Sequence, residues 1–251
     1  MQTIDELAPT PQPGPSRRRV RAGGVGVAAV ALAGLVGFGY SLGYLGHHQS
    51  MLRAQIVGTE NTPTGVVKVA SLVLSAYPDS MAGEHGTSGG AHPDWVSYGP
   101  SSNIWVPANS IIEVTIKNYD SATSLNSPYY SYVQGTIGGV AYYNGTPETH
   151  INSNDAGHTF TLHMFPTSGQ PTLDVNVPLM GVPSGAQNAP GSQYPAANVV
   201  TFRFRTGASG RYIWQCFVPC GGNAYVAGFG GPMQTIGYMT GTVTVGSGNN
   251  G

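Results

Sequence analysis

Short runs of alternating apolar and polar residues, separated by turn residues, dominate the chain from residue 66 to 246. Within residues 104–118, Ile112, Val114 and Ile116 alternate with polar neighbours, which is typical of a half-buried β-strand. Similar runs occupy residues 66–76, 158–165, 172–179, 198–206, 211–217 and 237–245. Because no helical periodicity separates these runs, the pattern predicts an all-β, antiparallel sandwich.

Two of the segments between these runs allow further predictions. The segment TGASG, residues 206–210, is typical of a tight hairpin turn between the strands on either side of it. Residues 119–157 are rich in Tyr, Gly and Asn and show no clear periodicity, so we expect a long insertion there. The tyrosines of this insertion either cover a sheet edge or form a docking surface. They are Tyr129, Tyr130, Tyr132, Tyr142 and Tyr143.

The N-terminal region differs from the rest of the chain. Residues 23–46 carry no charge over 24 positions, which is long enough to cross a hydrocarbon core of about 30 Å as a helix. Four arginines within residues 17–21 precede this run and favour a cytoplasmic N-terminus. We therefore predict a single-pass protein of the cell membrane with its C-terminal domain outside the cytoplasm. A cleaved signal peptide is the alternative.

These boundaries divide the chain into five parts. Residues 1–22 are expected to be a disordered, Pro-rich cytoplasmic tail, and residues 23–46 the transmembrane helix. Residues 47–65 are expected to be a juxtamembrane linker, followed by the β-rich domain at 66–246 and a flexible tail at 247–251.

Charge is scarce, with 10 Lys and Arg and 11 Asp and Glu among 251 residues. The chain has no basic patch beyond its N-terminus, so we do not expect nucleic acid as a partner. A domain with few carboxylates has few ion pairs to lose when those carboxylates are protonated. The composition therefore suggests a protein that tolerates an acidic habitat.

Cys216 and Cys220 are the only cysteines, and they stand four apart in the segment WQCFVPC. A Gly-rich loop follows them and ends at Met233. His158 begins its alternating run on the same face as Phe160, so it is expected to point into the sandwich. Outside the cytoplasm a cysteine pair is usually oxidised to a disulfide. A copper site and two free thiols are the alternatives.

The order of these segments resembles the cupredoxin family and, within it, the extracytoplasmic domain of subunit II of haem–copper respiratory oxidases. The resemblance spans residues 66–246 and is carried by DAGHTF and by the spaced motif F-x-F-x-T-G-x-x-G-x-Y-x-W-x-C. It implies a Greek-key sandwich with copper ligands at one end. The candidate ligands are His158, Cys216, Cys220 and Met233.

The implied ligand set is incomplete. Ala224 occupies the position where this family has its second histidine, and Ala227 occupies its methionine position. No histidine follows His163, whose place in the alternation predicts that it faces solvent. Three further histidines lie in the long loops, at His85, His92 and His150, and nothing in their spacing favours a ligand role. We therefore favour a Cys216–Cys220 disulfide and no cofactor, with copper as the alternative.

The resemblance also implies a function. The chain would be a non-catalytic, subunit II-like component of a respiratory terminal oxidase, with haem–copper chemistry in a partner subunit. Its partners would be the other membrane subunits, the lipid bilayer, and a redox donor protein or quinol acting through a partner subunit. A membrane-tethered mononuclear copper protein for electron transfer or copper delivery is the first alternative. A copper-less structural module of the cell surface is the second.

Overall fold

The structure is a computed structural model that describes residues 51–79, 95–164, 173–220 and 231–247. The chain divides into two units, Met1–His47 and His48–Gly251, and every described residue belongs to the second unit. The predicted cytoplasmic tail and transmembrane helix lie outside the described residues, as do residues 248–251 of the tail. Within the described ranges, no helix is long and apolar enough to cross a membrane.

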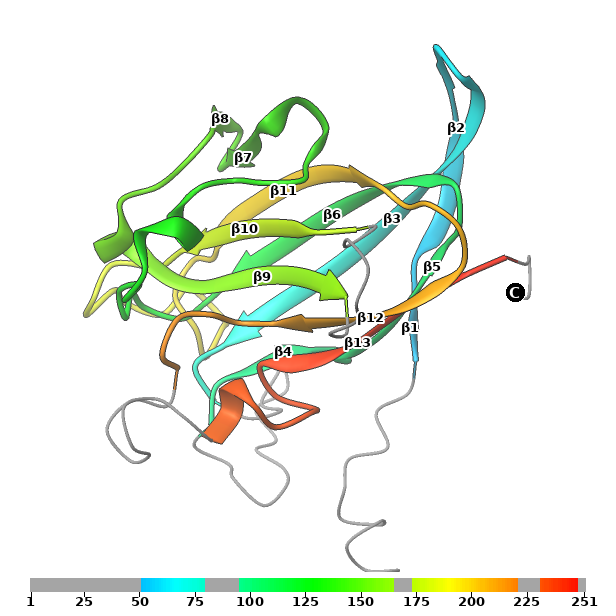
Figure 1. Cartoon of the computed structure of the whole chain (residues 1–251). Coiled ribbons are helices and arrows are strands. Elements are labelled where there is room, and N and C mark those ends of the chain that lie inside the picture. Colours follow the sequence, from blue (N-terminus) through cyan, green and yellow to red (C-terminus); the bar gives the residue numbers. More distant parts are fainter. Residues whose placement is uncertain (1–50, 80–94, 165–172, 221–230, 248–251) are drawn as a thin grey trace, which may run out of the picture. The chain divides into compact units, whose positions relative to one another are not determined.

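The described residues form two β-sheets that pack face to face (Figure 1). The first sheet contains, in spatial order, β1 (Leu52–Arg53), β5 (Asn103–Pro107), β13 (Thr240–Gly246), β12 (Gly210–Gln215), β9 (Ala156–Met164) and β10 (Val175–Met180). The second contains β2 (Gln55–Thr62), β3 (Gly65–Tyr77), β6 (Ser110–Asn118), β11 (Asn198–Arg205), β7 (Ala141–Tyr143) and β8 (Thr146–Glu148), with β4 (Ser97–Gly99) paired to β3. The predicted all-β architecture is confirmed.

The core lies between the two sheets, where the alternating residues meet. Ile112, Val114 and Ile116 of β6 are at most 1 % exposed, while the residues between them are only partly buried. From the first sheet, Phe160 reaches across to Phe202 of the second, with ring centroids 5.7 Å apart. The period-two pattern in the sequence therefore identified the buried face of these strands correctly.

Three strand pairings are parallel, which corrects the purely antiparallel arrangement that we predicted. β3 pairs in parallel with β6, and β5 pairs in parallel with both β1 and β13. The predicted hairpin turn at 206–210 instead connects β11 of the second sheet to β12 of the first. Alternation carries no information on strand direction or partner, so the pattern alone could not distinguish these arrangements.

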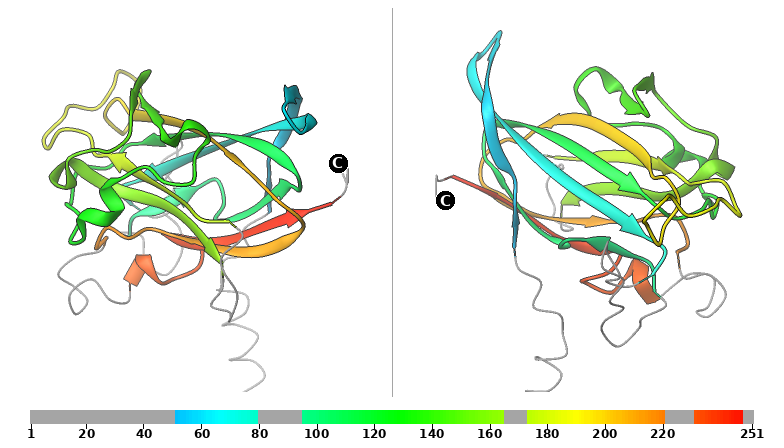
Figure 2. Two further views of the ribbon diagram at one scale, coloured as in Figure 1. Left: turned by 45° about the horizontal axis from the view of Figure 1, so that its top comes forward. Right: turned by 180° about the vertical axis from the view of Figure 1, so that it is seen from behind.

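The folded domain also begins earlier than predicted. Residues 52–62 fall within the range expected to be a linker, yet they form β1 and β2. β2 pairs with β3 along its length, and the β2–β3 hairpin extends beyond its neighbours in the second sheet (Figure 2). Ile56, Val57 and Val66 of this hairpin are largely exposed, so its apolar residues do not follow a simple one-sided pattern.

The insertion at 119–157 has more structure than its sequence suggested. It contains the short 3-10 helices η1 (Pro128–Ser131), η2 (Ile137–Gly139) and η3 (Ser153–Asp155), and its strands β7 and β8 extend the second sheet. A backbone bridge between Gln134 and Asn176 joins it to β10, the edge strand of the first sheet. The Asn176 side chain on the outer face donates to the carbonyls of Tyr130 and Tyr132. This cover explains why Thr159 and Thr161, on the outward face of β9, are buried.

Candidate metal centre

His158 lies near the start of β9 and is completely buried. β9 is held on both sides, by β10 through the pairing of His158 with Leu179 and by β12 farther along. The inward orientation predicted from its alternation with Phe160 is confirmed by its contacts, because it lies against Cys216 and Cys220 of the hydrophobic core. A strand fixed between two neighbours gives the imidazole a well-defined position.

Cys216 and Cys220 lie directly after β12, in a tight loop that is tied to its surroundings by hydrogen bonds. The Cys216 N–H donates to the carbonyl of Met239 at 2.9 Å, which fastens the start of the loop to the segment before β13. The Phe217 N–H donates to Thr159 Oγ1 at 2.8 Å, which fastens the next residue to β9. Both cysteines are therefore held beside His158, and both are buried, at 0 % and 3 % exposure.

Three side chains, His158, Cys216 and Cys220, converge on one point. His158 Nδ1 lies 3.0 Å from Cys220 Sγ and 3.8 Å from Cys216 Sγ, and the two sulfur atoms are 3.2 Å apart. These ligand atoms all lie within 4.8 Å of one another. The structure thus brings together three of the four residues that the sequence proposed as metal ligands.

Asp120 completes the surroundings of His158 from the other side of the ring. Its Oδ2 lies 3.1 Å from His158 Nε2, and its Oδ1 accepts a hydrogen bond of 2.7 Å from the Ser121 N–H. Asn118 shapes this turn, since its side chain donates to the carbonyls of Asp120 and Met180. A histidine that binds metal through one nitrogen is commonly oriented by a carboxylate at the other, and Asp120 stands in that position.

Burial and neighbouring charges act in opposite directions on these groups. Burial lowers the pKa of His158, but contact with Asp120 and Cys216 outweighs it and raises the pKa to about 9. Burial disfavours the Cys216 thiolate, yet hydrogen bonding from Cys220 and the nearby His158 lower its pKa overall. Burial and the Cys216 charge raise the pKa of Cys220. The cluster therefore favours one thiolate beside an imidazolium, and binding a metal through all three side chains would release two protons, one from His158 and one from Cys220.

The donor set fits a thiophilic metal ion. Thiolate sulfur and imidazole nitrogen select copper, in particular Cu(I), and also zinc. With metal–ligand bonds of about 2.0–2.3 Å, ligand atoms stand roughly 3.5–4 Å apart. The separations of Cys220 Sγ from His158 Nδ1 and from Cys216 Sγ would each have to increase by about half an ångström. Small rotations of the cysteine side chains can supply this change.

The predicted disulfide is not present between the cysteines of this structure, which are free. Their sulfur atoms are 3.2 Å apart, whereas a disulfide bond is about 2.05 Å long. The same small separation means that oxidation needs little movement. The disulfide therefore stays a prediction for the oxidised protein.

The other predicted residues lie in varied places. Met233 lies in η6 (Gly231–Met233), partly buried against the core, and its role as an axial ligand stays a prediction. His163 lies on the other face of β9 from His158, but it is half-buried there and does not face solvent as predicted. His150 is exposed and stacks on Tyr132. His85, His92 and most of the Gly-rich loop lie outside the described residues.

Two residues near the centre carry no signal that we recognised in the sequence. Asp120 is 38 positions before His158, beyond any local motif, and Asp155, the carboxylate closest to His158 in the sequence, is exposed in η3. Tyr98 of β4 is buried beside the cluster, with its hydroxyl donating to the Thr159 carbonyl at 3.2 Å and its ring edge against Trp214. Burial and the nearby cysteines raise the pKa of Tyr98, so it stays neutral.

Comparison with known proteins finds no matching family model and no matching curated protein. Among solved structures, rusticyanin from Thiobacillus ferrooxidans, described as a copper protein, is 14 % identical, covers 71 % of this chain and 77 % of its own, and has a TM-score of 0.34. Auracyanin B is 15 % identical over 76 % of this chain and 96 % of its own, with a TM-score of 0.28.

A multicopper oxidase is 13 % identical, with a TM-score of 0.34, and the match covers 79 % of this chain and 48 % of that one. Similarity at this level assigns neither a family nor a function to this chain. The metal centre is therefore inferred from the side chains themselves, His158, Cys216 and Cys220.

Proposed function

We propose that this domain is a mononuclear copper protein in which His158, Cys216 and Cys220 hold the ion. The observation that supports the proposal is the convergence of one imidazole nitrogen and two sulfur atoms at 3.0–3.8 Å in a buried position. Asp120 behind the imidazole adds the orienting carboxylate that metal-binding histidines commonly have. We prefer this proposal to the copper-less interpretation that we favoured from the sequence.

Copper fits this donor set better than zinc does. A structural zinc ion takes four protein ligands in a closed tetrahedron, whereas the described residues supply three strong donors from His and Cys. Two thiolates and one imidazole suit the three-coordinate, soft Cu(I) ion. When bound, copper would supply a one-electron redox couple, and the protein would supply a buried, fixed set of ligands for it. Met233 is the candidate for an additional weak ligand.

Two roles are compatible with such a centre, electron transfer and copper delivery. We further propose that the domain is carried outside the cytoplasm on the segment 23–46, next to the membrane. The spacing of Cys216 and Cys220 matches that in subunit II of haem–copper oxidases, which supports a place in a respiratory oxidase complex with the catalytic chemistry in a partner subunit. Purification of the chain from its native membrane tests this placement, and haem-bearing subunits are expected to accompany it.

The copper proposal is tested by metal titration of the full chain. Reduced protein is expected to bind one Cu(I) per chain in competition with a chromophoric chelator, and Cu(II) is expected to give an intense thiolate-to-copper absorption band. His158→Gln, Cys216→Ser and Cys220→Ser should each weaken Cu(I) binding at least a hundredfold. His150→Gln is the matched control, since that imidazole is exposed and stacks on Tyr132 outside the cluster. Equal affinity in the control and the three cluster variants would refute the proposal.

A further inference from the structure

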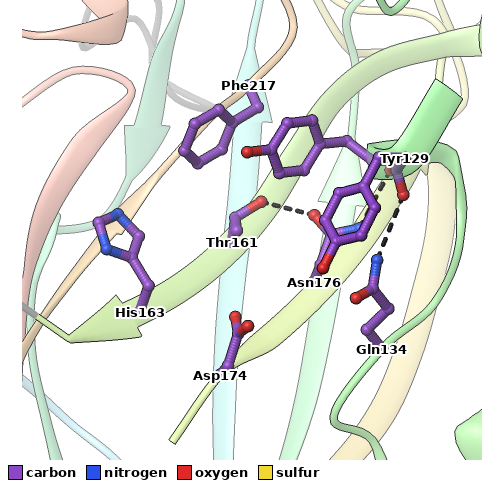
Figure 3. A pocket seen from close by; sticks show the side chains of 8 residues that line it. Tyr129, Gln134, Thr161, His163, Asp174, Asn176 and Phe217 are labelled. Atoms are coloured by element: carbon purple, nitrogen blue, oxygen red, sulfur yellow. Dashed lines mark hydrogen bonds between the residues drawn. The ribbon is translucent and has the colours of Figure 1, made fainter. Parts of the chain in front are cut away.

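A second candidate site lies on the outer face of the first sheet, next to the insertion (Figure 3). It is a cavity of about 260 Å³, and its lining residues are Tyr129, Tyr130, Gln134, Thr161, His163, Asp174, Asn176 and Phe217. Because a cavity of about 150 Å³ can hold benzene, this volume suits a molecule with a single substituted ring.

Aromatic rings form one side of the cavity. Tyr130 of η1 and Phe217 of the cysteine loop are stacked, with ring centroids 4.3 Å apart and ring planes 11° from parallel. Tyr129 stands edge-on to Tyr130 at 5.2 Å, and its ring is 58 % exposed. Rings arranged in this way favour a further planar ring, which gains offset-stacked or edge-to-face contacts that an aliphatic ring cannot make.

Part of the polar lining is used to fix the shape of the cavity. Asn176 donates to the carbonyls of Tyr130 and Tyr132 at 3.1 and 2.7 Å, and its oxygen accepts from Thr161 at 2.7 Å. Gln134 donates to the carbonyl of Tyr129 (Figure 3). These bonds hold the aromatic segment on β9 and β10, so the cavity is built into the fold.

The remaining polar lining consists of acceptors. His163 Nδ1 lies 3.0 Å from the carbonyl of Met164, which assigns the ring proton to that nitrogen and leaves Nε2 as an acceptor. Nε2 is buried and has no hydrogen-bond partner among the described residues. Asp174 adds an exposed carboxylate on the same cavity. Asp174 is the acceptor within reach of a molecule in the cavity, so a ligand that brings a hydroxyl donor is favoured.

We propose that this cavity binds a small planar aromatic molecule with hydroxyl groups, the class of the dihydroxybenzenes. The ring would lie against the aromatic side, and a hydroxyl group would donate to Asp174. The site adjoins the candidate metal centre, because Phe217 follows Cys216 directly and Thr161 Oγ1 lies 3.0 Å from Thr159 Oγ1, which accepts from the Phe217 N–H. The proposal itself does not depend on copper binding.

Calorimetric titration of the full chain, without added metal, tests the proposal with resorcinol as the probe. Saturable binding with one site per chain is expected. Cyclohexane-1,3-diol, which has the hydroxyl groups but no aromatic ring, and benzene, which has the ring but no donors, should each bind about tenfold more weakly. Equal affinity for either of them, or the absence of saturable resorcinol binding, would overturn the proposal.

Two variants and a matched control locate the site. Tyr129→Leu and Asp174→Asn are each expected to weaken resorcinol binding about five- to tenfold, because each removes a contact with the ligand. Tyr132→Leu is the control, since Tyr132 is 53 % exposed in the same segment but does not line the cavity. Circular dichroism checks that each variant is folded. An effect of Tyr132→Leu as large as that of Tyr129→Leu would place binding elsewhere and refute the assignment.

Discussion

The carboxylate of Asp120 determines how the His158 ring is presented to the two cysteines. It lies at Nε2, 3.1 Å away, and so leaves Nδ1 facing the sulfur atoms. Its own position is fixed by the Ser121 N–H and by the turn that Asn118 shapes. The carboxylate contacts the histidine, and its charge also contributes to the raised pKa of Cys220.

Asp120→Asn is therefore expected to weaken Cu(I) binding about 10- to 100-fold without abolishing it, because the amide is neutral and polarises the imidazole less. The chelator competition described above measures this change. Asp155→Asn, which removes an exposed carboxylate near His158 in the sequence, is the control and should leave the affinity unchanged within twofold. An unchanged affinity in Asp120→Asn would mean that Asp120 has no orienting role.

The sequence predicted three of the residues that converge, because strand parity gives the direction of His158 and the short spacing of the cysteines keeps them together. It could not predict Asp120 or Tyr98. Each comes from a distant element, and a carboxylate at the end of a strand is ordinarily solvated or bonded to its own backbone. Only the packing of the second sheet on the first brings them beside β9.

At the scale of elements, the turn that carries Asp120 packs very closely on the start of β9 and on the residue that follows β10. A Cβ atom added to Gly181 would lie 2.2 Å from the backbone nitrogen of Ala122, and one added to Gly157 would lie 2.9 Å from the carbonyl of Ser121. These two glycines therefore permit the approach of the turn to His158. Any side chain at Gly181 must displace backbone.

Gly181→Ala is expected to lower the free energy of unfolding by about 1–3 kcal/mol, because an added methyl group overpacks this contact. Urea denaturation followed by tryptophan fluorescence measures the change. Gly207→Ala is the matched control: its Cβ would meet no atom within 4 Å, and we expect a change within about 0.5 kcal/mol. Equal stability of the two variants would contradict this expectation, because it would mean that the turn can move to accommodate the added methyl group.

Most of the strands could be predicted from the sequence, but the strands that they pair with could not. The buried strands have the apolar alternation that a half-buried sheet requires, whereas β1 is two residues long and β2 is exposed along much of its length. Strands of that kind show no burial pattern in the sequence. Their partners, β5 and β3, are what define them as strands, and pairing between distant segments is not written in local alternation.

At the scale of the whole domain, buried tyrosines outnumber buried charges and set the expected response to pH. Burial raises the pKa of Tyr143, whose hydroxyl donates to the Pro178 carbonyl, and burial together with the hydrogen bond to Asp79 raises that of Tyr194. In the unfolded chain a tyrosine titrates near pH 10. Above that pH the unfolded state binds fewer protons than the folded state.

The free energy of unfolding is therefore expected to be unaffected by these tyrosines below about pH 10 and to fall as the pH rises beyond it. Denaturation between pH 8 and 12 measures this dependence. Tyr143→Phe should reduce the slope above pH 10, by up to about 1.4 kcal/mol per pH unit. Tyr132→Phe, which changes an exposed ring, should leave the slope as it is. A slope unchanged in Tyr143→Phe would contradict the expectation.

The all-β class of the domain followed from the sequence because strand alternation and turn residues fill it and helical periodicity does not. The predicted acid tolerance and the membrane segment remain predictions. Charge is used sparingly: Arg203 reaches both Glu60 and Glu113, and these contacts lie on partly exposed side chains. Such exposed ion pairs contribute little to stability, so protonating Glu60 and Glu113 should lower the free energy of unfolding only slightly.

The position of the last strand has a consequence for when the centre can form during protein synthesis. β13 lies between β5 and β12, and it alone joins the β1–β5 pair to the rest of the first sheet. The cysteine loop is itself fastened to Met239, immediately before β13. β12 already pairs with β9, but the cysteine loop gains this further anchor only after Met239 has left the ribosome. The full set of contacts around a copper ion would thus be complete only late in synthesis.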